Sequence, residues 1–94
     1  MSGPTDDLHL RASWQTPVSD VFMIEGCEIP LRLDTSHEGR LTDVSTVDRI
    51  YLGTISEAPE LGYFAFTHPA RDTTVKGPFR EFRHAVVHLV RSNA

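Results

Sequence analysis

The last stretch of the chain constrains the fold more than any other, because its apolar residues follow a helical period. The stretch has apolar residues at spacings of three and four, which places them on one stripe of an α-helix: Phe79, Phe82, Val86, Leu89 and Val90. The opposite face carries Arg80, Glu81, His84, His88 and Arg91. A Gly-Pro dipeptide opens the stretch, and proline at the first helical position loses an N–H that has no helical partner. The sequence therefore predicts a helix over residues 77–91.

A helix of this length is only marginally stable in water, so its apolar stripe requires a covering layer. Earlier segments supply one, because they alternate between apolar and polar residues or are rich in β-branched and aromatic residues. The predicted strands cover residues 8–14, 18–25, 28–34, 49–55 and 63–67. The strand over 18–25 is apolar throughout its centre, which predicts burial on both of its faces.

Glycine and proline residues punctuate these strands. Gly26 and Cys27 separate the second strand from the third, which predicts a hairpin. Pro30 lies inside the third strand, and because proline cannot donate to a strand ladder, this strand is expected at a sheet edge or a bulge. Gly53, inside the fourth strand, predicts a bulge or a sharp bend.

Two segments lack a single clear period. Over residues 40–47 the apolar side chains are spaced by three, which fits a short helical turn as well as an irregular strand. Residues 68–77 are polar and are predicted to form a loop between the last strand and the helix. Long loops often carry function, although a plain connector is the simpler interpretation here.

Together these elements predict a single small α+β domain over residues 8–94, preceded by a disordered leader over residues 1–7. About five strands form a small antiparallel, strongly bent sheet or a partly open β-barrel, closed by one C-terminal α-helix. An open sheet with the helix across one face has the same element order. The bends expected at Pro30 and Gly53 favour the barrel.

Composition narrows the classes of protein to consider. Hydrophobic residues make up 39% of the chain and charged residues 23%, as in ordinary globular domains. No apolar run approaches the ~20 residues of a membrane-spanning helix, and no basic start followed by an apolar run marks a secretory signal. Cys27 is the only cysteine, which excludes an internal disulfide and leads us to expect a cytoplasmic location.

Charge is divided unevenly along the chain. Residues 1–60 hold eleven acidic and four basic groups, a net charge of −7, whereas residues 61–94 hold two acidic and five basic groups, a net charge of +3. One interpretation is that the two halves of a small domain neutralise each other. The other is a bipolar surface whose basic pole, on the closing helix, meets an acidic partner.

No residue set predicts catalysis, a metal site or a cofactor site. His84 and His88 share one helical face, but a zinc site needs a third ligand, and the neighbouring Arg80 and Arg91 would repel a cation. Nothing in the sequence places a histidine beside Cys27, as a thiol nucleophile would require. Because no glycine-rich phosphate loop occurs either, the domain is expected to be non-catalytic.

Two other functions stay open as alternatives. Aromatic residues over 63–66 precede several basic residues, as in a small nucleic-acid-binding barrel, but the net charge of −4 argues against phosphate binding. A small-molecule-binding or enzymatic domain would need a deep pocket in the barrel mouth, lined by Tyr51, Tyr63 or Trp14.

The sequence therefore predicts a small binding or adaptor module that recognises an acidic protein partner. The residues predicted to bind this partner are Arg71, Lys76, Arg80, Arg83, His84 and Arg91. Mild acid should add positive charge to this surface through its histidines. The apolar segments 21–24 and 63–66 hold few charges, so an open strand edge also predicts a homodimer.

Overall fold

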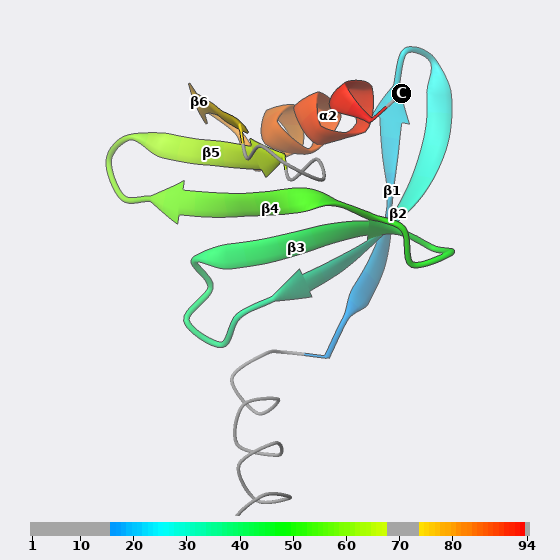
Figure 1. Cartoon of the computed structure of the whole chain (residues 1–94), viewed down its shortest axis with the longest axis horizontal. Helices are drawn as coiled ribbons and strands as arrows, with labels where there is room; N and C mark the ends of the chain where they lie inside the picture. Colours follow the sequence, from blue (N-terminus) through cyan, green and yellow to red (C-terminus); the bar gives the residue numbers. More distant parts are fainter. Residues whose placement is uncertain (1–15, 68–73, 94) are drawn as a thin grey trace, which may run out of the picture.

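The computed structural model describes residues 16–67 and 74–93, which form a bent antiparallel sheet with one helix across one face (Figure 1). The sheet has six strands in chain order, each paired with the next. They are β1 (Val18–Ile24), β2 (Cys27–Thr35), β3 (Leu41–Thr46), β4 (Tyr51–Ala58), β5 (Gly62–Thr67) and β6 (Thr74–Phe79), and the helix is α2 (Phe82–Ser92). The α+β class and the C-terminal helix are confirmed. Within the described part β1 and β6 are the two edges, so the sheet is not closed into a barrel.

The sequence predicts no strand at β6 and leaves β3 ambiguous, but both are strands of the sheet. The six strands are therefore these two and four of the five predicted ones, because the fifth, over 8–14, lies outside the described residues. Strand β6 consists of residues that the sequence assigned to the loop over 68–77 and to the first turn of the helix. A Cβ on Gly77 would lie 2.7 Å from the carbonyl oxygen of Tyr63, so the glycine allows β6 to approach β5 closely. Pro78 is tolerated because β6 is an edge strand. The Gly-Pro dipeptide therefore belongs to a strand and not to a helix start.

Helix α2 consequently begins at Phe82, five residues later than the predicted start, with Glu81 as an extended N-cap residue. The predicted apolar stripe is otherwise correct, since Val86 and Leu89 are fully buried. Phe79 also packs against the core, but from β6. The side-chain amide of Asn93 donates to the main-chain oxygens of Leu52 (3.0 Å) and Leu89 (2.8 Å), which ties the end of the helix to β4.

The hairpin of β1 and β2 is confirmed, with a turn one residue earlier than expected. Glu25 and Gly26 form the turn, both with positive φ (53° and 81°), as in the tight turns that match strand twist. Pro30 lies in an inner strand, contrary to the edge position expected for it. It is tolerated because the pairing of β2 with β3 ends at Leu31, so Pro30 has no neighbour on that side.

Strand β1 is not buried on both faces, which corrects the prediction for residues 18–25. Only Ile24 is buried, while Val18, Val21 and Met23 are 61%, 54% and 63% exposed. The physical reason is that β1 is an edge strand and α2 covers only one face of the sheet.

The ambiguous segment 40–47 contains strand β3, and not a helical turn. Thr42 and Val44 alternate into the core, whereas Leu41 and Val47, which gave the spacing of three, are exposed. The bulge expected near Gly53 lies in the pairing of β3 with β4, at Val44 and Ser45.

The core lies between the sheet and α2. Its fully or nearly fully buried side chains are Leu31, Val44, Leu52, Ile55, Ala65, Ala85, Val86 and Leu89. No helix among the described residues is long and apolar enough to cross a bilayer. The predicted leader over 1–7, the predicted strand over 8–14 and most of the predicted loop over 68–77 lie outside the described residues.

Candidate protein-interaction surface

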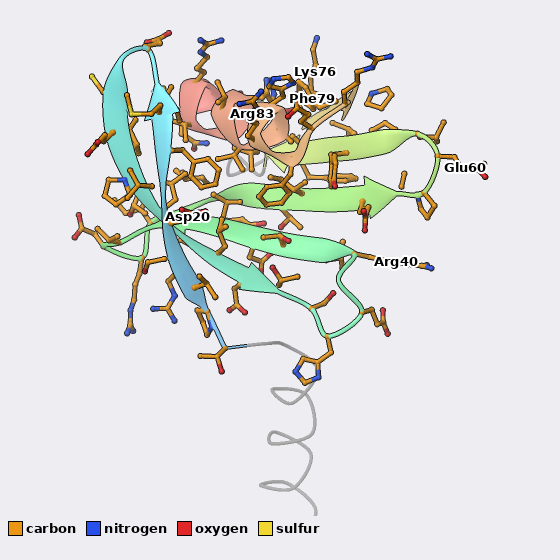
Figure 2. All side chains as sticks on the ribbon, turned by 180° about the vertical axis from the view of Figure 1, so that it is seen from behind. Asp20, Arg40, Glu60, Lys76, Phe79 and Arg83 are labelled. Atoms are coloured by element: carbon orange, nitrogen blue, oxygen red, sulfur yellow. The ribbon has the colours of Figure 1, made fainter. Side chains whose placement is uncertain are left out.

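The outer side of α2 and the adjoining part of β6 carry most of the basic residues predicted to bind a partner. We call this surface, together with the link that joins β6 to α2, the basic face. It consists of Lys76 on β6, Arg80 in the link, and Arg83, His84, His88 and Arg91 on α2. Figure 2 shows Lys76, Phe79 and Arg83 gathered beside the helix, whereas Arg40 and Glu60 extend from the other end of the sheet. Arg71, also predicted to belong to it, lies outside the described residues.

Glu81 partly neutralises the N-terminal end of the basic face. Its carboxylate lies 3.1 Å from Nε of Arg83 and 3.9 Å from Nε2 of His84. The Arg83 side chain is nevertheless 67% exposed. Exposed ion pairs contribute little to stability because water screens them, so a partner carboxylate can compete with Glu81 at little cost.

Arg91 forms the other ion pair of this surface. Its Nε lies 3.4 Å from a carboxylate oxygen of Glu25, at the tip of the β1–β2 hairpin, and its side chain is 60% exposed. Within residues 16–67 and 74–93, Lys76 and Arg80 take part in no ion pair. The acidic half of the chain therefore balances part of the basic face, as one of the two charge interpretations expects, but not all of it.

His88 differs from the other basic residues because it is partly covered. Its ring packs against that of Phe79, with 5.6 Å between the ring centres, and Nε2 lies 3.3 Å from the hydroxyl of Ser92. Burial lowers the pKa of His88, and the positive charge of Lys76 lowers it further. His88 therefore gains its charge only at a lower pH than an ordinary histidine, which weakens the expected effect of mild acid.

Two grooves flank α2 and share His84 and Val87. The first, of about 460 Å³, lies towards β1 and is lined by Val21, Phe22, Met23, Arg83, His84 and Val87. The second, of about 440 Å³, lies towards β6 and is lined by Phe79, His84, Val87, His88 and Arg91. We call them the β1 groove and the β6 groove. Because of the shared residues, the two grooves adjoin on the outer side of the helix, with Arg83 in the first and Arg91 in the second.

The structure places His84, His88 and Arg91 on one surface of α2, as predicted, and adds Arg83 to it, whereas Arg80 precedes the helix. It also places the edge strand β1 beside this surface, which the sequence did not predict. Val21 and Met23 were expected inside the core, and Glu25 was not expected beside Arg91. No local signal could have identified them, because an edge strand and a central strand can have the same composition.

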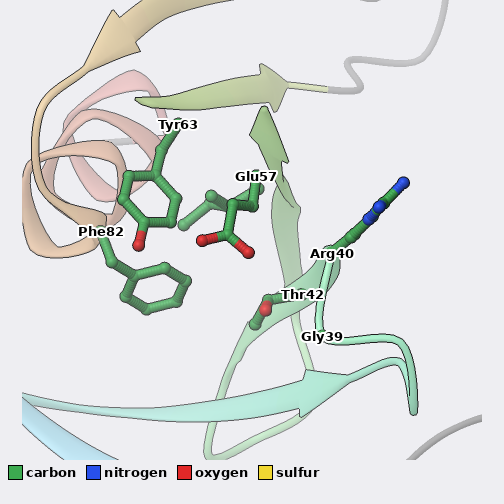
Figure 3. Close-up of a pocket in the computed structure, with 7 residues that line it drawn as sticks. Gly39, Arg40, Thr42, Glu57, Tyr63 and Phe82 are labelled. Carbon is green, nitrogen blue, oxygen red and sulfur yellow. The ribbon is translucent and has the colours of Figure 1, made fainter. Parts of the chain in front are cut away.

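A separate small cavity lies between the sheet and the start of α2. Figure 3 shows Tyr63, Phe82 and Glu57 turned towards one space, while Arg40 extends away from it. The rings of Tyr63 and Phe82 meet edge to face, 5.8 Å apart. The cavity measures about 150 Å³, whereas small-molecule sites usually measure roughly 300–1,000 Å³. Tyr63 thus lines a cavity, as the small-molecule alternative required, but one too small for a cofactor.

Two carboxylates face each other on the side of the sheet away from α2. Asp34 and Asp43 are directly opposite in the pairing of β2 with β3. Asp43 accepts a hydrogen bond from Oγ1 of Thr54 (2.7 Å), whose hydroxyl also bonds that of Tyr51. One oxygen of Asp34 is buried and accepts no hydrogen bond from the described residues. In this part of the chain no three potential ligands gather as a metal site would require.

No protein-family model, no characterised protein sequence and no solved structure matches the chain. The candidate surface therefore stands on its own geometry.

The lowered pKa of His88 leads to a prediction about stability. A folded-state pKa below the unfolded value of about 6.5 means that the unfolded chain binds the proton more readily. The contribution of His88 to the free energy of unfolding is therefore fully present above the unfolded pKa. It falls as the pH drops below that value and levels off below the folded-state pKa. In urea unfolding measured from pH 8 down through the unfolded pKa of about 6.5, His88→Gln should lose less stability on acidification than the wild type. Equal slopes for the two proteins would contradict this.

Proposed function

We propose that this domain is a non-catalytic binding module that recognises an acidic protein partner through the basic face. The observation that carries the proposal is that two grooves adjoin on α2, because His84 and Val87 line both, with Arg83 beside the first and Arg91 beside the second. Protein-recognition surfaces combine apolar side chains with accessible charged side chains, and arginine is enriched at such surfaces. A cytoplasmic location is part of the proposal, since the only cysteine, Cys27, is an exposed free thiol that suits a reducing compartment.

Electrostatics would act mainly on the rate of association. The whole chain has a net charge of −4, so the basic face is a local positive region on a negative molecule. Such a region orients an acidic partner during approach and raises the association rate at low salt. Exposed cations add little affinity individually, so the apolar residues of the grooves would supply the remaining binding energy.

The proposal predicts a salt-dependent loss of binding in the double variant Arg80→Ala/Arg91→Ala. With labelled poly-glutamate as an acidic probe, we expect about tenfold weaker binding than wild type at low salt, and a smaller difference at high salt. Arg40→Ala/Arg49→Ala is the matched control, because it removes the same charge from residues outside the basic face. If both double variants bind alike, the basic face only balances the acidic half of its own domain.

Nucleic-acid binding is tested in the same experiment with labelled single-stranded DNA. Phosphate contacts release counterions, so a nucleic-acid site would give a steep dependence of affinity on salt. Tighter binding of DNA than of poly-glutamate would favour the nucleic-acid alternative over the proposed function.

A further inference from the structure

The outer edge of β1 offers main-chain groups to a further strand. Among the described residues β1 pairs only with β2. Hydrogen-bonded and non-hydrogen-bonded pairs alternate along an antiparallel ladder, and the pair next to a two-residue turn is hydrogen-bonded. Because that pair is Ile24 with Cys27, the main-chain groups of Ser19, Val21 and Met23 point away from β2.

A side-chain contact supports this orientation. The N–H of Val21 donates to Oδ1 of Asp20 at 2.8 Å, in an exposed position. Its partner across the hairpin is Pro30, which has no N–H to exchange. Asp20 therefore occupies the place that the carbonyl of an incoming strand would take. A charge on an edge strand also opposes indiscriminate pairing.

The β1 groove lies beside this edge and indicates which side chains an incoming strand would carry. Phe22 and Ile24 turn towards the core, so Val21 and Met23 lie on the opposite face of β1. An added strand would share both faces, because successive side chains alternate. Its inner side chains would meet Arg83, His84 and Val87 of α2, and its outer side chains would lie beside Val21 and Met23.

We propose that β1 and α2 form a site for β-strand addition, in which an extended peptide with alternating acidic and apolar residues pairs with the outer edge of β1. Main-chain hydrogen bonds would supply affinity, and the alternation of charge would supply specificity. A second copy of the chain fits less well, because two-fold pairing of β1 would bring the basic residues of two α2 helices to one side of the same sheet. The proposal rests on the proposed function and adds the mode of binding and the partner's sequence pattern.

The test uses the full chain and two labelled synthetic peptides of equal composition. In one, glutamate and valine alternate; in the other, the glutamates form one block and the valines another. Fluorescence anisotropy should show about tenfold tighter binding of the alternating peptide, and hydrogen exchange should show protection of the Val21 amide when that peptide is added. Equal binding of the two peptides, or an unprotected Val21 amide, would overturn the proposal.

Variants of the edge separate main-chain pairing from side-chain contact. Val21→Pro removes the outward N–H without touching the ladder to β2, so it should abolish the preference for the alternating peptide. Val21→Ala keeps the N–H and should retain most of the preference. Asp20→Asn should bind more tightly than wild type, because the edge loses a negative charge that repels the acidic peptide. Should Val21→Pro fail to fold, the exchange of the Val21 amide in the wild type decides alone.

The failures of the two proposals give different results. If poly-glutamate binds but the alternating peptide shows no advantage over the block peptide, strand addition is wrong and the proposed function stands. If none of the three probes binds, the proposed function is wrong as well. A dimer in sedimentation that persists when the alternating peptide is added would assign the edge to a second copy instead.

Discussion

Replacing Gly53 by alanine is expected to leave the domain largely unfolded. A Cβ at this position would lie 2.6 Å from Cδ2 of Leu89 and would also clash with the carbonyl oxygen of Phe66. The φ of +154° adds strain for any residue with a side chain. The main-chain carbonyl cannot move without breaking the pairing of β4 with β5, so the clash is not relieved by a side-chain rotation. We expect a loss of about 4 kcal/mol or more, comparable with the stability of a small domain.

Gly26→Ala is the matched control for this prediction. Gly26 also has a positive φ, of 81°, but a Cβ there would meet nothing within 4 Å. Its substitution therefore carries only the backbone strain, about 1–2 kcal/mol. Urea unfolding measures both changes. Similar losses of unfolding free energy for the two variants would mean that α2 does not pack closely against β4 at Gly53.

Leu89→Ala is expected to have the second largest effect. Leu89 is fully buried and lies on Gly53, where α2 meets the middle of the sheet. Truncating Leu89 leaves a cavity between the backbone of α2 and the backbone of β4 at Gly53. Neither backbone can move to fill that cavity. We therefore expect a loss of about 3–4 kcal/mol, within the usual range for buried leucines.

Leu61→Ala tests the same chemical change at the surface. Leu61 is 65% exposed in the turn between β4 and β5, so its truncation should change stability by no more than about 0.5 kcal/mol. Phe82→Ala should fall between the two leucine variants, because Phe82 is only half-buried at the start of α2. A loss for Phe82→Ala greater than that for Leu89→Ala would mean that the helix is anchored at its first turn and not at its centre.

These variants also bear on the proposed binding surface. Leu89 and Gly53 hold one side of α2 on the sheet, and this places Arg83, His84 and Val87 on the other side, beside β1. Loss of the core contact would therefore disturb the β1 groove without changing any residue that lines it. Binding experiments on core variants need conditions in which the variant is folded.

The sequence by itself determined those elements that depend only on residues close together in the chain. The period of the apolar residues predicts α2, because every third or fourth residue faces the same direction on a helix. The short link predicted at Gly26–Cys27 and the patterns beside it predict the hairpin of β1 and β2, because a tight turn constrains only neighbouring residues. The observed turn lies one residue earlier. The cluster of basic residues near the C-terminus also follows from the sequence, since one helix presents most of them together.

Only the tertiary structure decided which strands are inner and which are edges. Val21 and Met23 have the composition of a buried strand, but they are exposed because no other element of the described structure covers the far face of β1. Phe79 fits the helical period, but it belongs to β6 because Gly77 and Pro78 allow an edge strand to lie against β5. The ion pair of Arg91 with Glu25 joins residues from opposite ends of the chain. Each of these depends on contacts through space, and a periodicity along the chain carries no information about which segment lies across from another.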